Sequence, residues 1–217
     1  MSERFRIPVV LAPDEIVGHM RENIIIPLPG ELAVVDRMKP TVTPEDYKPF
    51  NFDIDTATPL ATYGSEYIFH ISSSMHGPDG FSNNDPVNAA KRVSQLHRKI
   101  ENNRDEIVLT KRYDVDDCDV LIIATGAVTR AARAAALEAR KAGIKAGVLQ
   151  LLTIWPFPDK EIIAAAQRAK TIIVPEMNYS GQLAGEITKL FGSAINVKKV
   201  NSFNGGMITP THVLKAI

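Results

Sequence analysis

The chain has 217 residues, 45% of them apolar and 23% charged, and its 25 basic and 25 acidic residues give a formal net charge of zero. This composition is typical of globular proteins, and the length fits one large domain or two small ones. The sequence has no run of about 18 apolar residues and no signal-peptide core, so we expect a cytoplasmic protein without a membrane span.

A single cysteine and an uneven charge distribution narrow the function classes. Cys118 is the only cysteine, which excludes an internal disulfide and a four-cysteine zinc or iron–sulfur site within the chain. Its neighbours Asp117 and Asp119 are expected to raise the thiol pKa, so we predict a structural cysteine.

Residues 1–118 hold 13 Lys/Arg and 19 Asp/Glu, whereas residues 119–217 hold 12 and 6. The basic half suits an acidic ligand or subunit, or its lysines are simply solvated. No basic patch with interleaved aromatics indicates nucleic-acid binding.

The first half of the chain predicts the end of one domain followed by a linker. Apolar runs at 7–12 and 24–29 predict short strands, and Asp14 is placed to cap a helix between them. We therefore predict that residues 1–28 end a first α/β domain. Residues 29–60 contain prolines that interrupt every period, which predicts an extended linker. These prolines are Pro29, Pro40, Pro44, Pro49 and Pro59.

A second domain is predicted over residues 61–217. Tyr67 to Ile71 is strand-like, and Asp85 with Pro86 predicts the start of a helix that runs to about Asn103. Apolar residues spaced three or four apart predict that this helix buries one stripe. The stripe is Val87, Ala90, Val93, Leu96 and Ile100. From residue 118 strands alternate with helices, which predicts an α/β fold with a parallel sheet covered by helices on both faces.

Two candidate sites receive little support from the residues. The strand-to-helix loop at Gly126 lacks the glycines of a dinucleotide fingerprint, and Val128 would block approach of a pyrophosphate. None of the five histidines has the spacing of a helical metal pair. His70 and His76 flank a loop with Asp79, where a metal site and a structural hydrogen bond are the alternatives.

Two further stretches predict a functional surface at the carboxyl ends of strands. Trp155 and Phe157 lie in "WPFP" just after a strand, where α/β sheets place ligands and partners. Large aromatic side chains are typical interface anchors, and the alternative is that both fold back over the local core. Glu176, Asn178 and Gln182 lie at the next strand end, where they either meet a ligand or subunit or satisfy backbone groups in the turn.

The stretches "TIWPFPDKEI", "TIIVPEMNYSGQLAGEI" and "NGGMITP" resemble the C-terminal domain of 2-oxoacid:ferredoxin oxidoreductase alpha subunits, nearest to the 2-oxoglutarate type. "HGPDG" and "AAKRVSQLHRKI" resemble the family's upstream loop and helix. Pro13 and the longer turn at Asn178 to Gly181 depart from the family pattern. Family alpha subunits are longer, so the resemblance implies a fragment or a split-gene subunit that lacks the N-terminal pyrimidine-binding domain.

The resemblance implies a fold of the transketolase C-terminal type and a part in one overall reaction. In that reaction a 2-oxoacid, coenzyme A and oxidised ferredoxin give acyl-CoA, carbon dioxide and reduced ferredoxin. Thiamine diphosphate would supply the carbanion chemistry. It and the iron–sulfur clusters would lie on partner subunits: a beta subunit, with gamma and ferredoxin-like subunits as further candidates. No cofactor or metal is then expected on this chain alone, although coenzyme A is a candidate ligand of its basic half.

The resemblance also implies that this part of the enzyme is structural and has no catalytic residue. Trp155, Phe157, Glu176, Asn178 and Gln182 are then candidates for a subunit interface or a channel. Two alternatives stay open at this point, a stand-alone interaction or regulatory module and a transketolase-like enzyme fragment. The 2-oxoacid and the oligomeric state are not determined by the sequence.

Overall fold

The computed structural model describes residues 1–217, and the chain divides into two compact units. Unit 1 comprises residues 1–11 and 22–107, and unit 2 comprises residues 12–21 and 108–217. Residues 61–107 thus lie in the same unit as the proline-rich segment 29–60. The domain boundaries after residues 28 and 60 stay a prediction.

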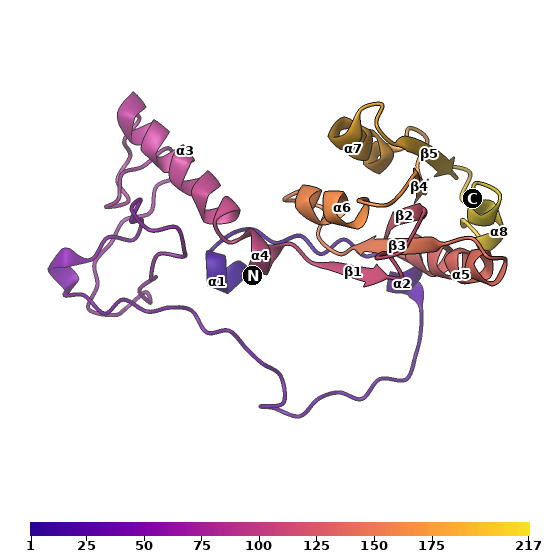
Figure 1. The fold of residues 1–217 in the computed structure, drawn as a ribbon. Coiled ribbons are helices and arrows are strands. Elements are labelled where there is room, and N and C mark those ends of the chain that lie inside the picture. Colours follow the sequence, from indigo (N-terminus) through magenta and orange to yellow (C-terminus); the bar gives the residue numbers. More distant parts are fainter. The chain divides into compact units, whose positions relative to one another are not determined.

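Unit 2 contains a five-stranded sheet in the order β1-β3-β2-β4-β5 (Figure 1). Four strands are mutually parallel: β2 (Val120–Thr125), β3 (Ala146–Leu151), β4 (Thr171–Glu176) and β5 (Asn196–Asn201). The predicted α/β class is confirmed, and the sheet is parallel as predicted in these four strands. β1 (Thr110–Tyr113) pairs antiparallel with β3 at one edge and was not predicted. Its sequence, TKRY, has no apolar run that would indicate a strand.

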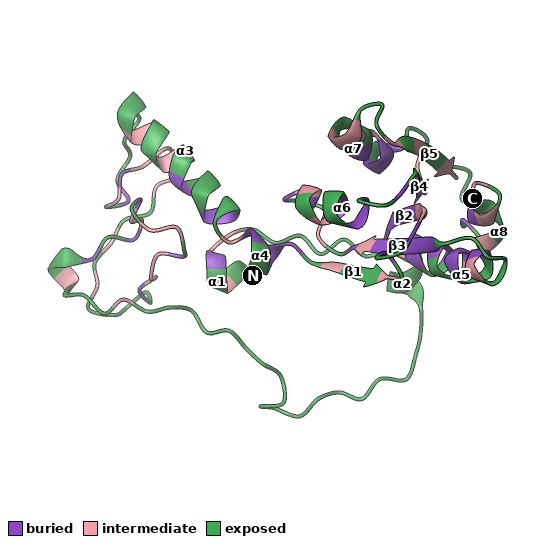
Figure 2. Cartoon of the chain, viewed as in Figure 1, coloured by how far each residue is buried: buried purple, intermediate pink, exposed green.

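Helices cover both faces of this sheet. α5 (Val128–Lys141) and α8 (Pro210–Leu214) pack on one face, and α6 (Asp159–Ala165) and α7 (Gln182–Phe191) pack on the other. Alternate residues of β2 point to opposite sides, with Leu121 and Ile123 in one apolar cluster and Ile122 in the other. The central strands are therefore buried on both faces, as Figure 2 shows in purple.

Residues 12–21 belong to unit 2 although they precede most of unit 1 in the chain. They contain α2 (Glu15–His19), which is shorter than the predicted helix. Asp14 lies at its N-cap position but makes no side-chain cap there. Its carboxylate instead accepts a hydrogen bond from the backbone N–H of Ala127, at 2.6 Å, at the start of α5. The predicted capping role is therefore wrong, and a distant helix receives the carboxylate.

Unit 1 has little regular structure. It contains α1 (Ser2–Phe5), the 3-10 turn Pro44–Asp46, α3 (Pro86–Glu101) and α4 (Arg104–Ile107). The irregular course of residues 29–60 agrees with the prolines in that segment. The strands predicted at 7–12, 24–29 and 67–71 are absent. A strand requires a hydrogen-bonded neighbour, and the described structure pairs none of these apolar runs with one.

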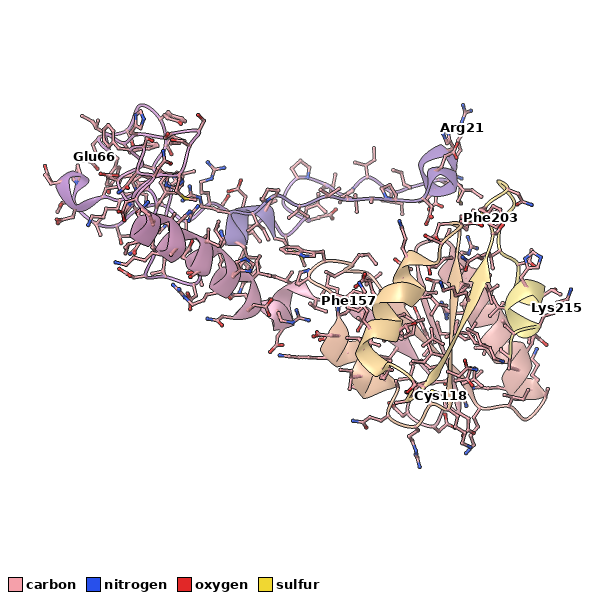
Figure 3. The ribbon with its side chains drawn as sticks, turned by 90° about the horizontal axis from the view of Figure 1, so that it is seen from above. Arg21, Glu66, Cys118, Phe157, Phe203 and Lys215 are labelled. Carbon is pink, nitrogen blue, oxygen red and sulfur yellow. The ribbon has the colours of Figure 1, made fainter.

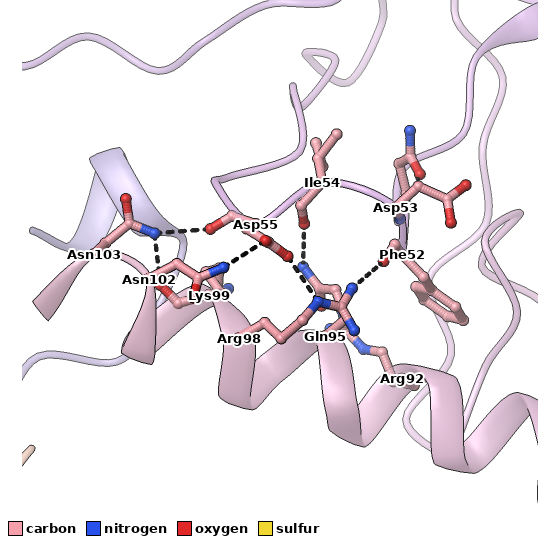
Figure 4. A network of polar contacts seen from close by, with 11 residues as sticks. Phe52, Asp53, Ile54, Asp55, Arg92, Gln95, Arg98, Lys99, Asn102 and Asn103 are labelled. Atoms are coloured by element: carbon pink, nitrogen blue, oxygen red, sulfur yellow. Dashed lines mark hydrogen bonds and ion pairs between the residues drawn. The ribbon is translucent and has the colours of Figure 1, made fainter.

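The predicted helix after Pro86 is confirmed as α3, but its predicted buried stripe is wrong except at Ile100, which packs with Phe5 and Ile107. Val87 is 63% exposed and Val93 is 45% exposed, whereas Gln95 and Lys99 on the neighbouring face are buried. Polar side chains of α3 reach the facing segment 52–55 and bind its carbonyl groups (Figure 4). Hydrogen bonds to backbone carbonyls, rather than apolar contacts alone, therefore determine which face of α3 turns inward.

Candidate functional site at the carboxyl edge of the sheet

The topology of unit 2 creates a crevice at the carboxyl ends of β2 and β4. The chain leaves β2 for α5 on one face of the sheet and leaves β4 for α7 on the other. Ligands and partners of open α/β sheets are found at such a switch point. Phe203, just after β5, lies at the same end, opposite Cys118 (Figure 3). An open depression of about 640 Å³ lies here, next to the end of β2.

All five sequence-predicted candidates line this depression. They are Trp155, Phe157, Glu176, Asn178 and Gln182. Thr125, Ile154, Leu183 and Glu186 complete the lining and were not singled out from the sequence. The structure therefore brings the two stretches "WPFP" and "EMN" together, although 17 residues lie between them in the chain.

The two aromatic side chains of the "WPFP" turn differ in their exposure. Trp155 is 72% exposed, and its peptide bond to Pro156 is cis. Phe157 is half-buried and packs against the apolar cluster beneath α6 and α7. Of the two alternatives, folding back over the core applies to Phe157 only. Trp155 presents its ring to the surroundings, which is costly in water for so large an aromatic.

Glu176 is a structural carboxylate that begins α7. It is 7% exposed, and its oxygens accept hydrogen bonds from the backbone N–H groups of Leu183 and Ala184 at 2.8 and 2.9 Å. A negative charge at this place satisfies free helix N–H groups and complements the helix dipole. A carboxylate so engaged is not available to a ligand as a free acceptor.

Asn178 completes the same turn. Its side-chain amide donates to Glu176 at 2.8 Å, and its carbonyl oxygen accepts from the N–H of Gly181 at 2.6 Å. Asn178 therefore has the backbone-satisfying role that was the alternative to ligand binding. Gln182 is exposed on the first turn of α7 and is the candidate whose amide faces solvent.

Sequence reasoning missed an exposed aromatic pair at this edge. Tyr179 and Phe203 are 78% and 64% exposed, and their rings meet edge to face with centroids 4.9 Å apart. Met177 in the same turn is 40% exposed. These three residues do not line the depression itself, but with its exposed lining residues Ile154 and Trp155 they give this edge an exposed apolar surface, here called the apolar rim. Tyr179 stands one residue after a predicted candidate, so its position was the available signal.

The remaining sequence candidates have structural surroundings. His70 stacks on Phe81 with ring centroids 4.6 Å apart, and His76 Nδ1 lies 3.2 Å from the carbonyl oxygen of Gly77. Neither histidine belongs to a group of three or more possible metal ligands. Cys118 is fully buried, and burial, followed by the charge of Asp117, raises its thiol pKa. None of the helices is both long and apolar enough to cross a membrane.

Comparison with known proteins shows what the chain is similar to. Residues 118–213 match the model of the pyruvate:ferredoxin oxidoreductase core domain II. The matched residues all lie within unit 2. The whole chain is 34% identical to the 2-oxoglutarate synthase subunit KorA of Methanothermobacter marburgensis, of which it covers 57%. It is 28% identical over its whole length to the ketoisovalerate oxidoreductase subunit VorB of the same organism and covers 53% of it.

A solved structure confirms the fold. The 2-oxoglutarate:ferredoxin oxidoreductase of Magnetococcus marinus superposes on 88% of this chain with a TM-score of 0.78 and 24% identity, over 33% of its own chain. The resemblance that the motifs carried is confirmed by these relatives: the chain is similar to a portion of 2-oxoacid:ferredoxin oxidoreductase alpha subunits. It spans a little over half the length of the curated relatives that it matches.

Proposed function

We propose that this chain is a structural and assembly part of a 2-oxoacid:ferredoxin oxidoreductase, and that the apolar rim of the depression binds a partner subunit. The observation that carries the proposal is Trp155, a large aromatic that is 72% exposed beside the switch-point crevice. Exposed aromatics around a crevice are typical of interfaces, whose central anchors are enriched in tryptophan and tyrosine.

The side chains at the depression fit a protein interface better than a phosphate-bearing coenzyme. Glu176 and Glu186 are its charged lining residues, and no lysine or arginine lines it. A diphosphate would meet like charge there without a cation to pair it. The single, buried Cys118 likewise cannot supply the thiolate set of an iron–sulfur cluster. Thiamine diphosphate and the clusters therefore belong to partner subunits in this proposal.

The reaction of the assembled enzyme would join a 2-oxoacid, coenzyme A and oxidised ferredoxin to give acyl-CoA, carbon dioxide and reduced ferredoxin. Thiamine diphosphate, when bound to the beta subunit, would supply the carbanion chemistry. The role of this chain is to hold the subunit surface in place. Glu176 fixes the start of α7, and Asn178 fixes the turn that carries the exposed Tyr179.

The sole tryptophan makes the interface directly testable. The chain is titrated with the thiamine- and cluster-bearing beta subunit from the same genome, and co-purification and the binding constant are measured. Trp155→Ser should weaken binding at least tenfold, since truncating a central interface anchor costs about 2 kcal/mol or more. Leu137→Ser is the matched control because Leu137 is 53% exposed on α5, on the opposite face of the sheet.

The same titration separates the alternatives. Co-purification that is unaffected by Trp155→Ser would keep the assembly role but contradict the proposed interface. Failure of the intact chain to bind any such beta subunit would favour a stand-alone interaction module. Oxidation of 2-oxoacids by the purified chain alone would contradict the structural role.

A further inference from the structure

Unit 1 contains a buried face that is cationic instead of apolar. Arg92, Gln95 and Lys99 follow one another on the same side of α3, spaced three and four residues apart. Gln95 is 2% exposed and Lys99 is 5% exposed, whereas most of the predicted apolar stripe is exposed and only Ile100 is buried. Lysine is almost never so deeply buried without a partner of opposite charge.

A small hollow lies against this face. Its volume is about 80 Å³, and its lining includes three cations, Arg6, Arg92 and Lys99. Its other polar lining residues are Thr56, Thr58 and Gln95. No aspartate or glutamate lines it. The hollow therefore gathers three positive charges and hydrogen-bonding groups without a counter-charge.

The hydrogen bonds of the three cations all go to neutral acceptors. Arg6 donates to the carbonyl oxygens of Pro49 and Thr58 at 3.1 and 2.8 Å. Arg92 donates to Gln95 at 2.7 Å, and Lys99 Nζ donates to the carbonyl of Arg6 at 3.3 Å. A guanidinium has five N–H donors and an ammonium has three, so donors remain at each cation.

The cations also disfavour one another's charged forms. Burial, and then the charges of Arg92 and Arg6, lowers the pKa of Lys99 to about 8. Burial and the charge of Arg6 lower the pKa of Arg92 as well. Nearby ion pairs relieve little of this repulsion: Asp55 binds Arg98 on the exposed side of the helix, and Glu3, whose charge favours charged Arg6, is paired with Arg37, whose charge opposes it. Like charges held together in this way are stabilised most directly by a bound anion.

The backbone at Arg6 is strained in a way that keeps its carbonyl and side chain at the hollow. Arg6 adopts a left-handed conformation with φ of 45°, which a residue with a side chain rarely does. Its carbonyl accepts from Lys99, and its guanidinium lies 5.6 Å from the centre of the Phe50 ring. Strain of this kind persists where surrounding contacts over-determine it.

We propose that this hollow binds one phosphate-sized oxyanion between Arg6, Arg92 and Lys99. A volume of about 80 Å³ corresponds to two or three waters at about 30 Å³ each, so it admits a single compact oxyanion and excludes a sugar or a base. Two guanidinium groups and an ammonium suit the charge and oxygen geometry of a tetrahedral phosphate. The ligand is free phosphate or the terminal group of a phosphate monoester.

Binding is measured on the whole chain by titration calorimetry with inorganic phosphate, with chloride holding the ionic strength constant. We expect saturable binding that Lys99→Met and Arg92→Met each weaken at least tenfold. Lys91→Met removes the same charge from an exposed position of α3 and should leave the affinity unchanged within twofold. A simple phosphate monoester is titrated in parallel: equal affinity identifies a terminal phosphate group as a ligand, and weaker binding identifies free phosphate.

Three results would overturn the proposal. They are no saturable phosphate binding by the intact chain, equal loss of affinity in Lys91→Met, and equally tight binding of acetate. The first would mean that the cations only hold Arg6, the segment 49–58 and α3 together. Because the first and third results are measured on the intact chain, they do not depend on whether the variants fold.

Discussion

Removing the negative charge of Glu176 should loosen the start of α7 by a calculable amount. In Glu176→Gln one acceptor oxygen becomes an amide, so either Leu183 or Ala184 loses its acceptor and meets a donor. A hydrogen bond to a charged group contributes about 1.5–3 kcal/mol, and the lost charge–dipole interaction adds up to about 1 kcal/mol. We expect a local loss of about 2–3 kcal/mol, allowing for partial relaxation.

Amide hydrogen exchange followed by NMR measures this loss at the two residues directly. Since about 1.4 kcal/mol corresponds to a factor of ten, exchange at Leu183 and Ala184 should accelerate about 30- to 150-fold. Glu186→Gln is the control in the same helix, because Glu186 pairs only with the exposed Lys189 and should cost less than about 0.5 kcal/mol. Exchange in Glu176→Gln within threefold of the control would refute the capping role.

Three other perturbations test separate parts of the chain. Gly147→Ala should destabilise unit 2 by about 2 kcal/mol or more, because its Cβ would lie 2.5 Å from a backbone carbonyl oxygen. Gly185→Ala, whose Cβ would point into open space on α7, should instead stabilise unit 2 by about 0.5–1 kcal/mol. Urea denaturation measures both changes. Gly126→Ala places a Cβ at the carboxylate of Asp14, at a φ of +62°, and should increase proteolysis of the segment 12–21 at least fivefold. The pKa of Lys99 is lowered to about 8 in the folded chain. Between pH 8 and 10.5 the Lys99 amine is therefore protonated in the unfolded chain and largely deprotonated in the folded chain. The free energy of unfolding should therefore rise through this window by at most about 3 kcal/mol relative to Lys99→Met. A flat difference between the two curves would contradict the burial of the charged amine.

The regular part of the fold follows from the sequence because its signals are local. Continuous apolar runs such as "VLIIAT" predict buried parallel strands, and the alanine-rich run from Val128 predicts the helix that crosses between them. The polar edge strand β1 carries no such signal, because β3 supplies its partner and no apolar face is required.

The candidate residues were predictable as a set but not in their individual roles. Their position after two strand ends placed them at one edge of the sheet, where the structure brings them together. Whether Glu176 meets a ligand or a helix depends on how the turn to α7 closes, which spacing does not reveal. The buried cations of α3 could not be predicted for a related reason. The spacing of apolar residues predicts which face of a helix is apolar. The polar face of α3 is buried because it binds carbonyl groups of a segment about 40 residues earlier in the chain, and the helix sequence does not reveal those partners.

The contact of Asp14 with the start of α5 has a consequence for the loop at Gly126. In doubly wound folds this first turn often receives a phosphate. Here a side chain from 113 positions earlier in the chain supplies the negative charge, and the Asp14 carboxylate lies where even a methyl group on Gly126 would collide. An anionic ligand could bind this loop only by displacing the Asp14 carboxylate. Ligand binding at the loop and docking of residues 12–21 are therefore mutually exclusive.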